Sequence, residues 1–441
     1  MAWQHERSLL GGNGQGARFV VLLLTPWVLG CANRHGTTDA EPGVPDADSR
    51  ADEGAVGIAP NLDGRIGLAS GSSCDASAQC LSGACTLGVC SDWAHAMQIV
   101  IDTTSAGADV NADVEDFPLL VRLSESARNF AFSEARQGGA DIRFVDAKGN
   151  NLSYEIERWD TKNAVAELWV LVPHIGGNSR NNFVLMYWGN PLAAPISSGP
   201  SVFSDDSLVF HMAEDLDNSP THIQDDSGQG NTGLVQSQAK TSLRGDGIAG
   251  DGLALDGIST YLATTLRLTA PQPVSISLWL KVDSASKGGI AGFASKQSGN
   301  DVHYDRAIEM DSHGLLSFAV QHDGTLATVS SLEGYGDGQW HFIVARFSRS
   351  GQYLFVDGES IADDPATTSA DAYQGFWRFG QEPALATPST APDAAVSTGD
   401  FISGSIDEIR IATDERSEAW IKLSYATQLP RPIAVVYSAR H

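Results

Sequence analysis

Two glutamates stand two positions apart in the segment LSYEIE, and such a pair has the residue types for acid/base chemistry. Side chains of a β-strand alternate between its faces, so Tyr154 and Ile156 fall on one face and Glu155 and Glu157 on the other. Glycosidases use two carboxyl groups about 5 to 10 Å apart. The alternative is a solvated strand face that carries no chemistry. We expect this second arrangement.

Motifs of the common catalytic machineries are absent from the sequence. It contains no Gly-x-Ser-x-Gly elbow, no His-Glu-x-x-His helix and no phosphate-binding glycine loop. His211, His303 and His341 lie among aromatic residues rather than at metal-ligand spacing, so we expect them to serve packing. Enzymatic activity stays open, with binding favoured over catalysis. A glycan-active hydrolase or lyase would need carboxylates from separate strands, which predicts clustered acids with raised pKa values in a concave groove.

Composition limits the classes of protein to consider. The 441 residues include 28 Lys and Arg against 54 Asp and Glu, a net charge of −26, so we expect no nucleic-acid partner. The 45 glycines and 18 prolines argue against a helical bundle. No apolar run reaches the roughly 18 to 20 residues of a membrane-spanning helix. The composition is typical of short strands joined by turns.

The first 30 residues have the features of an export signal. A short apolar run, FVVLLLTPWVLG, ends at Cys31, and its last residues resemble the lipobox of bacterial lipoprotein signals. That resemblance implies lipidation of Cys31 and a membrane contact through the lipid anchor only. An ordinary secretory signal is the alternative. We expect an exported, membrane-anchored protein, at the outer membrane or cell surface.

Two short regions follow the predicted signal. Residues 31–72 are rich in Gly, Asp, Glu, Pro and Ala, and are predicted to be a disordered acidic linker. Residues 73–91 hold four cysteines in the pattern C-x5-C-x4-C-x4-C. An even number in an exported chain predicts two disulfides, in one of three pairings, whereas a zinc site would need closer Cys pairs. The four residues are Cys74, Cys80, Cys85 and Cys90.

Residues 93–200 consist of short alternating runs separated by Gly, Asn and Asp turns, the pattern of an antiparallel β-sandwich. Four blocks in this region, DFPLLVRL, GGADIRFVDAKGNNLSYEIERWD, AELWVLVP and NFVLMYWGNP, follow one another as in the domain of unknown function 2341 family. This resemblance implies an exported β-sandwich that often accompanies lectin-like domains. The family has no established catalytic residues to carry over.

Residues 203–415 predict a second and larger sandwich. Its strands include VSISLWLKV and WHFIVARFS, and Asp-Gly pairs supply tight hairpin turns. The blocks DDSGQGNTG, LALDGISTYL, GQWHFIVARFSRSGQYLFVDG and ISGSIDEIRI resemble laminin G-like, concanavalin A-type jelly rolls. The expected fold is therefore all-β, with two consecutive antiparallel β-sandwich domains. Residues 416–441 predict a helix from Ser417 to Gln428 and a last strand that pack on the sandwiches.

The jelly-roll resemblance implies a candidate site for structural calcium, because the closing IDEIR strand lies beside a Gly/Asp-rich loop. The candidate ligands are Asp226, Asn231 and Asp407. The alternative is that the first two cap a turn and Asp407 binds backbone amides. Glycosidases of this fold carry Glu-x-Asp on the same strand, and Ser405 occupies the place of the nucleophilic glutamate here, which excludes that chemistry.

Binding of a glycan or of a cell-surface protein is the function that this architecture favours. Sugar-binding sandwiches offer exposed aromatic rings to the apolar faces of pyranoses, with polar loop groups fixing orientation. Tyr304, Tyr373 and Trp377 are the candidate loop-borne rings. A purely structural or adhesive envelope protein is the remaining alternative, and it predicts no groove.

Overall fold

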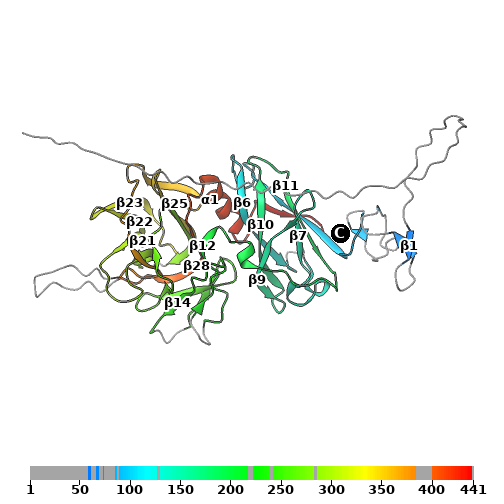
Figure 1. The fold of residues 1–441 in the computed structure, drawn as a ribbon, viewed down its shortest axis with the longest axis horizontal. Coiled ribbons are helices and arrows are strands. Elements are labelled where there is room, and N and C mark those ends of the chain that lie inside the picture. Colours follow the sequence, from blue (N-terminus) through cyan, green and yellow to red (C-terminus); the bar gives the residue numbers. More distant parts are fainter. Residues whose placement is uncertain are drawn as a thin grey trace, which may run out of the picture. The chain divides into compact units, whose positions relative to one another are not determined.

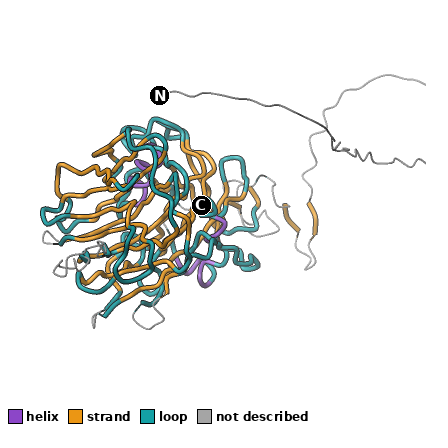
Figure 2. The backbone as a smooth tube through the Cα atoms, turned by 60° about the vertical axis from the view of Figure 1, so that its left-hand side comes forward, coloured by secondary structure: helices purple, strands orange, loops and turns teal. Residues whose placement is uncertain are grey.

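A computed structural model of the chain describes residues 58–60, 66–68, 73, 85–86, 89–126, 130–216, 222–238, 242–282, 286–383 and 400–439. It confirms the predicted all-β fold, in which antiparallel strands predominate (Figures 1 and 2). Within the described residues, no helix is both long and apolar enough to cross a membrane.

The first sandwich packs a three-stranded sheet, in the order β6-β10-β9, against a five-stranded sheet, in the order β29-β5-β11-β7-β8. Both sheets bury alternating apolar side chains in one core, which includes Trp169 and Trp188. The strands are β5 (His95–Ile101), β6 (Val114–Ser124), β7 (Arg143–Val145), β8 (Asn151–Leu152), β9 (Tyr154–Asp160), β10 (Val165–Ile175), β11 (Asn182–Trp188) and β29 (Val435–Tyr437).

The second sandwich consists of two larger antiparallel sheets around a separate apolar core. One sheet has the order β15-β16-β28-β19-β24-β25-β26, with β12 also paired to β28. Its strands are β12 (Asp206–Phe210), β15 (Arg244–Asp246), β16 (Asp251–Asp256), β19 (Val274–Val282), β24 (Trp340–Ser348), β25 (Gly351–Val356), β26 (Glu359–Asp364) and β28 (Ser403–Ala412).

The other sheet has the order β13-β14-β17-β27-β20-β21-β22-β23, with β18 paired to β27. Its strands are β13 (His222–Ile223), β14 (Gly233–Gln236), β17 (Tyr261–Thr264), β18 (Leu268–Thr269), β20 (Gly288–Ala294), β21 (Tyr304–Met310), β22 (Leu315–His322), β23 (Thr325–Gly334) and β27 (Gln374–Phe379).

Strand β28 positions the residues discussed below. It pairs with β12 in a register that sets Phe210 opposite Ile409. His211 therefore leaves the end of β12 next to Glu408, although the two are 197 positions apart in sequence. In the first sandwich, β9 pairs with β10 so that Glu155 lies opposite Trp169.

The C-terminal segment joins the two sandwiches. Helix α1 (Glu418–Gln428) begins after the N-cap Ser417, whose side chain accepts a hydrogen bond from the Trp420 amide. The helix buries Trp420, contacts both β6 and β26, and shares the core of the first sandwich. The strand β29 then pairs with β5 in the first sandwich. In addition, Arg122 of β6 donates hydrogen bonds to the carbonyls of Ile248, Gln428 and Leu429.

The region before the first sandwich is described only in short pieces: two strand pairs and Ser73. The pairs are formed by β1 (Ile58–Pro60) with β2 (Ile66–Leu68) and by β3 (Cys85–Thr86) with β4 (Val89–Cys90). Cys85 is disulfide-bonded. Cys31, Cys74 and Cys80 lie outside the described residues, so lipidation and the pairing of the cysteines stay predictions.

Candidate functional site

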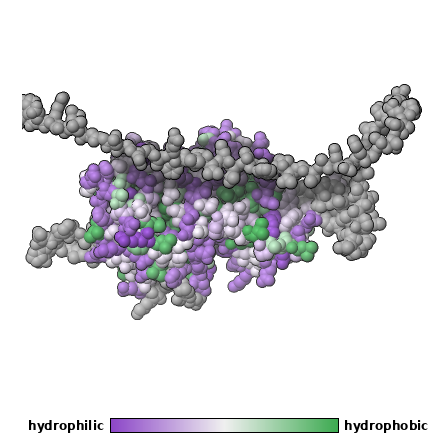
Figure 3. Space-filling model, in the orientation of Figure 1, coloured by the Kyte–Doolittle hydropathy of each residue, from purple (hydrophilic) through white to green (hydrophobic). Residues whose placement is uncertain are grey.

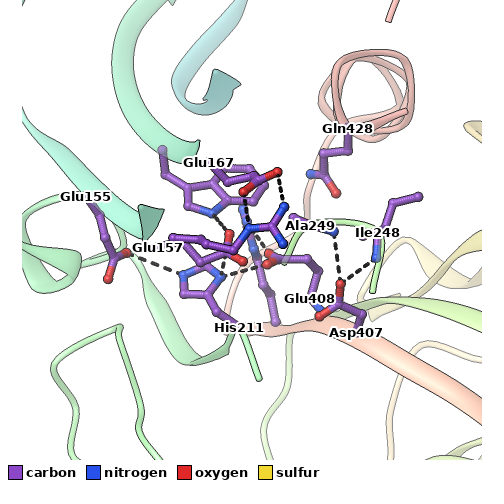
Figure 4. A network of polar contacts seen from close by, with 12 residues as sticks. Glu155, Glu157, Glu167, His211, Ile248, Ala249, Asp407, Glu408 and Gln428 are labelled. Atoms are coloured by element: carbon purple, nitrogen blue, oxygen red, sulfur yellow. Dashed lines mark hydrogen bonds and ion pairs between the residues drawn. The ribbon is translucent and has the colours of Figure 1, made fainter. Parts of the chain in front are cut away.

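A cluster of ionisable side chains lies where the two sandwiches meet (Figure 4). Strand β9 of the first sandwich supplies two of its members. The second sandwich supplies the rest from the end of β12, from the loop between β13 and β14, and from β28. We call it the junction cluster, and its members are Glu155, Glu157, His211, Asp226, Asp407 and Glu408.

The His211 imidazole is the centre of the junction cluster, and this residue is 2% exposed. Its Nδ1 lies 2.8 Å from Glu408 Oε1 and 3.9 Å from Glu157 Oε2. On the opposite edge of the ring, Nε2 lies 3.4 Å from Glu155 Oε2. The ring also stacks on Trp169, with centroids 5.7 Å apart and an interplanar angle of 22°. Figure 4 shows glutamates approaching the imidazole from both sides.

Further contacts hold these carboxylates in place. The Trp169 indole donates a hydrogen bond of 2.8 Å to Glu157 Oε2. Arg410 donates one of 2.9 Å to Glu408 Oε2, and its guanidinium lies 4.1 Å from the centroid of the Trp169 ring. A close approach also requires Gly199, because a Cβ there would lie 2.7 Å from Glu155 Oε1. The cluster is therefore held by packing as well as by charge.

Several buried polar atoms of the junction cluster have no hydrogen-bond partner among the described residues. They include His211 Nε2 and Glu155 Oε2, which form an ion pair at 3.4 Å without hydrogen-bond geometry. Within the described part of the chain, Glu157 Oε1 also has no hydrogen-bond partner, and neither has Nη1 of Arg410, which neighbours the cluster. Buried polar groups are nearly always paired, and each exception needs an explanation.

Burial and mutual repulsion raise the pKa values of three acids in the cluster. Burial, together with the charge of Glu408, raises the pKa of Glu157 to about 8. Burial raises the pKa of Asp226 to about 7, with a further contribution from Glu155. The pKa of Asp407 is raised well above its ordinary value by burial and by the charges of Glu408 and Glu157.

The central pair shifts in the opposite sense, toward the charged forms. Burial opposes the imidazolium form, but the carboxylates of Glu408 and Glu155 outweigh it and raise the pKa of His211 well above its ordinary value. Burial likewise opposes ionisation of Glu408, yet the charges of His211 and Arg410 leave the pKa of Glu408 lowered. These shifts favour an imidazolium at His211 that is hydrogen-bonded to the carboxylate of Glu408, with the other acids of the cluster around them.

The expectation of a solvated face for Glu155 and Glu157 is wrong. Glu155 is 9% exposed, and the Glu157 side chain is 1% exposed. The alternation along β9 was interpreted correctly, but the polar face turns toward the second sandwich instead of water. His211 was expected to serve packing, and it does stack on Trp169, but its carboxylate partners were missed. No local signal could have found them, because they come from distant parts of the chain.

The three candidate calcium ligands are used differently. Asp407 Oδ2 accepts hydrogen bonds from the amides of Ile248 and Ala249, as the backbone-bonding alternative predicts. Asn231 Oδ1 accepts one from the amide of Leu266. Asp226 instead has a potential ligand atom close to atoms of Glu155 and His211. The turn is capped by the neighbouring Asp225. Backbone amides thus occupy oxygens of Asp407 and Asn231, and calcium binding by the three residues stays a prediction.

A polar hollow of about 330 Å³ lies at one end of the second sandwich. Asn231 contributes a side-chain amide whose Nδ2 is buried and has no partner among the described residues. Exposed neighbours include Asp205 and Gln229, while Leu266 supplies an apolar face that is 42% exposed. The hollow is lined by Ser204, Asp205, Asp206, Ser207, Gln229, Asn231, Leu266, Leu268 and Thr413.

Two of the three predicted aromatic platforms are buried strand residues, and only Tyr373 lies on a loop. Tyr304 begins β21 and Trp377 lies within β27, where they are 5% and 1% exposed, so both belong to the interior. Tyr373 lies outside the strands, is partly exposed, and its hydroxyl donates to Asp305 Oδ1 at 2.7 Å. Large aromatic side chains gain most by burying their area in a core, which explains the outcome.

Elsewhere the surface carries scattered exposed hydrophobic residues, among them Leu192 and Leu332. Figure 3 shows hydrophilic side chains over most of one face, with hydrophobic ones in small groups. A larger groove of about 900 Å³ runs between β6 and β29 of the first sandwich. Its exposed apolar residues, Ile433 and Val436, are 68% and 51% exposed.

Comparisons with solved structures give only distant similarity. The binding domain of botulinum neurotoxin DC, solved with rat synaptotagmin II, shares 13% identity at a TM-score of 0.36, over 52% of this chain and 53% of that one. This chain thus spans about half the length of the botulinum binding domains. Domain 4 of AbnA, a GH43 extracellular arabinanase from Geobacillus stearothermophilus solved with arabinotriose, shares 16% identity at a TM-score of 0.33, over 49% and 97%. These similarities are too low to assign a function.

Family profiles match two parts of the chain, whereas no curated protein matches it. Residues 138–221 match the domain of unknown function DUF2341. Residues 256–422 match the concanavalin A-like lectin/glucanases superfamily. The chain therefore combines a domain of the unknown-function 2341 family with a laminin G-like, concanavalin A-type domain, as the sequence blocks predicted.

Proposed function

We propose that the chain is an exported, lipid-anchored envelope protein whose second sandwich binds a glycan in the polar hollow. One observation carries the proposal. Asn231, whose buried amide nitrogen has no hydrogen-bond partner among the described residues, lines the hollow, and residues 256–422 of the same sandwich match the lectin/glucanases superfamily. An unpaired buried donor costs about 1 to 3 kcal/mol, which a ligand acceptor would offset.

The lining of the hollow suits a sugar. Serine hydroxyls, the Asp205 carboxylate and the Gln229 amide offer donors and acceptors in the numbers that a polyhydroxylated ligand uses. The exposed face of Leu266 provides an apolar contact in place of an aromatic ring. A volume of about 330 Å³ matches the lower limit of small-ligand sites, so we expect a terminal sugar or disaccharide to occupy it.

The clustered carboxylates with raised pKa values favour a catalytic function. The absence of a groove that exposes them, among the described residues, argues against it. Glu155, His211 and Glu408 are each 9% exposed or less. A polymeric substrate could not reach these groups without separation of the two sandwiches. Binding therefore remains the function that the geometry supports best.

A glycan array probed with the full chain, with calcium and again with chelator, tests the proposal. The variant Gln229→Ala alters the lining of the hollow at an exposed position, and Gln339→Ala changes an exposed glutamine that does not line it. We expect Gln229→Ala to weaken binding at least tenfold and Gln339→Ala to leave it unchanged. Equal binding by both variants would remove the hollow from the proposal. If the wild type binds no glycan on the array, the glycan is excluded and a surface protein becomes the expected partner.

Anchoring is tested separately at Cys31, which lies outside the described residues. We expect mass spectrometry of the cell-derived protein to find Cys31 acylated at the new N-terminus. Substitution of Cys31 by alanine should then release the protein from the membrane fraction. Membrane association without Cys31 would exclude the lipid anchor.

A further inference from the structure

The geometry points to a binding site for a first-row divalent metal ion at the junction of the two sandwiches, with Glu155, His211 and Asp226 as ligands. Each residue offers one ligand atom, and the three atoms lie within 4.8 Å of one another. This site is independent of the proposed glycan hollow and differs from a calcium site in ligand chemistry. Imidazole nitrogen with carboxylate oxygen suits zinc-like ions, whereas calcium prefers oxygen alone.

Two of the three ligand atoms have the spacing that such an ion requires. Bonds of about 2.1 Å in a tetrahedral zinc site place neighbouring ligand atoms about 3.4 Å apart. His211 Nε2 and Glu155 Oε2 are 3.4 Å apart. That distance is too long for a good hydrogen bond and fits two ligands of one metal ion.

Both atoms are also buried without a hydrogen-bond partner, which is the second observation. The residues are 2% and 9% exposed, and His211 Nε2 and Glu155 Oε2 have only each other, at 3.4 Å and without hydrogen-bond geometry, among the described residues. Gly199 leaves the room that the Glu155 carboxylate occupies, since a Cβ would approach Oε1 to 2.7 Å. A cation between these atoms would supply the missing interaction for both.

The opposite edge of the imidazole completes a metal-binding arrangement. His211 Nδ1 lies 2.8 Å from Glu408 Oε1, and Arg410 holds the other oxygen of Glu408 at 2.9 Å. A carboxylate that accepts the Nδ1 proton orients a ligating histidine and leaves the Nε2 lone pair for the metal. Glu408 is therefore a positioning residue. Binding of the metal displaces the proton that Nε2 carries in the imidazolium form.

The third ligand leaves the site open on one side. Asp226 is partly exposed, unlike the other two ligands, and lies on the loop that leads to Asn231 in the polar hollow. Three protein ligands leave a fourth position for water in a tetrahedral zinc site.

Two other histidines provide matched controls. His341 also contacts two aspartates, Asp357 at 2.8 Å and Asp337 at 3.1 Å, but both ring nitrogens already have partners. His322 forms an exposed group of potential ligands with Asp323 and Asp371. Neither His341 nor His322 combines burial with an unpaired nitrogen.

Titration of the metal-free full chain with zinc chloride, followed by calorimetry and by elemental analysis after dialysis, tests the site. We expect one zinc ion per chain in the wild type. Glu155→Gln and Asp226→Asn should each weaken binding at least tenfold, and His341→Gln and His322→Gln should leave the retained ion in place. Substitution with cobalt gives a second readout, because its visible absorption reports tetrahedral coordination and should be lost in Glu155→Gln.

Three outcomes would overturn the inference: no retained zinc in the wild type, unchanged binding in both Glu155→Gln and Asp226→Asn, or loss of the ion in His322→Gln. Circular dichroism of each metal-free variant separates lost ligands from a lost fold. Glu408→Gln adds a test of positioning, with an expected tenfold weaker affinity at unchanged stoichiometry. Calcium chloride alone should not displace the zinc.

Discussion

Two buried clusters of charge in this chain handle their carboxylates in different ways. Inside the second sandwich, Asp305 accepts hydrogen bonds of 2.7 Å from Arg306 Nη1 on both oxygens and one of 2.7 Å from the Tyr373 hydroxyl. The amide of Gln321 adds another at 3.2 Å. Arg306 in turn donates to the carbonyl of Pro271. Every group of this pair is satisfied by the protein.

The junction cluster contains more carboxylates than cations. Glu155, Glu157 and Glu408 surround one imidazole, and Arg410 neutralises only the last of these. Burial, with added repulsion from neighbouring carboxylates, raises the pKa values of Glu157 and Asp226, and several buried polar atoms of the cluster have no hydrogen-bond partner among the described residues. In the Asp305–Arg306 pair the folded protein itself supplies every hydrogen-bond partner and the balancing charge. The junction cluster needs an additional proton or metal ion to balance its charge.

The largest effect is expected from Asp305→Asn. The amide cannot accept from Arg306, the Tyr373 hydroxyl and the Gln321 amide as the carboxylate does, and it leaves the 1% exposed guanidinium without its counter-charge. Breaking one partner of a buried ion pair costs about 3 to 5 kcal/mol. Urea unfolding of the metal-free chain measures this loss. A cost below about 1 kcal/mol would show that the pair is not the structural element described here.

The second effect is a dependence of stability on pH. The pKa of Glu157 is raised to about 8, so the folded state binds this proton more tightly than the unfolded chain. The stabilisation from Glu157 is fully present below pH 4.5 and is lost as the pH rises toward 8. The pKa of His211 is also raised, so its contribution to stability falls in the same direction once the pH exceeds the ordinary pKa of a histidine.

We therefore expect the free energy of unfolding of the metal-free chain to fall by about 3 to 4 kcal/mol between pH 5 and 8. Glu157→Gln keeps an acceptor for the Trp169 indole and removes the titrating group, so its curve should be flatter. The exposed Glu333→Gln serves as control and should follow the wild type. Parallel curves for all three chains would contradict the burial of an acid at Glu157.

A smaller effect is expected from Glu155→Gln without metal. No described group donates to Glu155 Oε2, so the amide loses only the ion pair of 3.4 Å with His211. We expect a change below about 1 kcal/mol in urea unfolding with chelator, against the much larger cost of Asp305→Asn. A loss as large as that of Asp305→Asn would make the two clusters equivalent and would end the comparison.

The smallest effect is expected from Lys422→Ala on helix α1. Lys422 forms exposed ion pairs with Asp109 at 3.1 Å and with Glu359 at 3.2 Å, which water and salt screen. We expect a change of about 0.5 kcal/mol or less, shrinking further in high salt. Thermal unfolding at two ionic strengths measures it. A loss of stability above about 2 kcal/mol would show that these ion pairs make a large contribution to holding helix α1 against both sandwiches.

Local patterns predicted the strands and the helix, because they depend on nearest neighbours in the chain. The alternation in LSYEIE placed Glu155 and Glu157 on one face of a strand, and the helix predicted from Ser417 to Gln428 is α1. Exposure was predicted poorly, since the polar face of β9 meets the second sandwich. The buried rings of Tyr304 and Trp377 were misjudged for the same reason, because burial is decided by partners from elsewhere in the chain.

What the sequence by itself determined is the all-β class and the pair of domain families, since alternation, turn residues and ordered blocks are local properties of the chain. Only the tertiary structure decided what the junction cluster is. Strand β28 pairs with β12 and sets His211 beside Glu408, and the contact between the sandwiches then adds Glu155 and Glu157. Electrostatic interactions depend on distance in space and on burial, and neither can be obtained from positions along the chain.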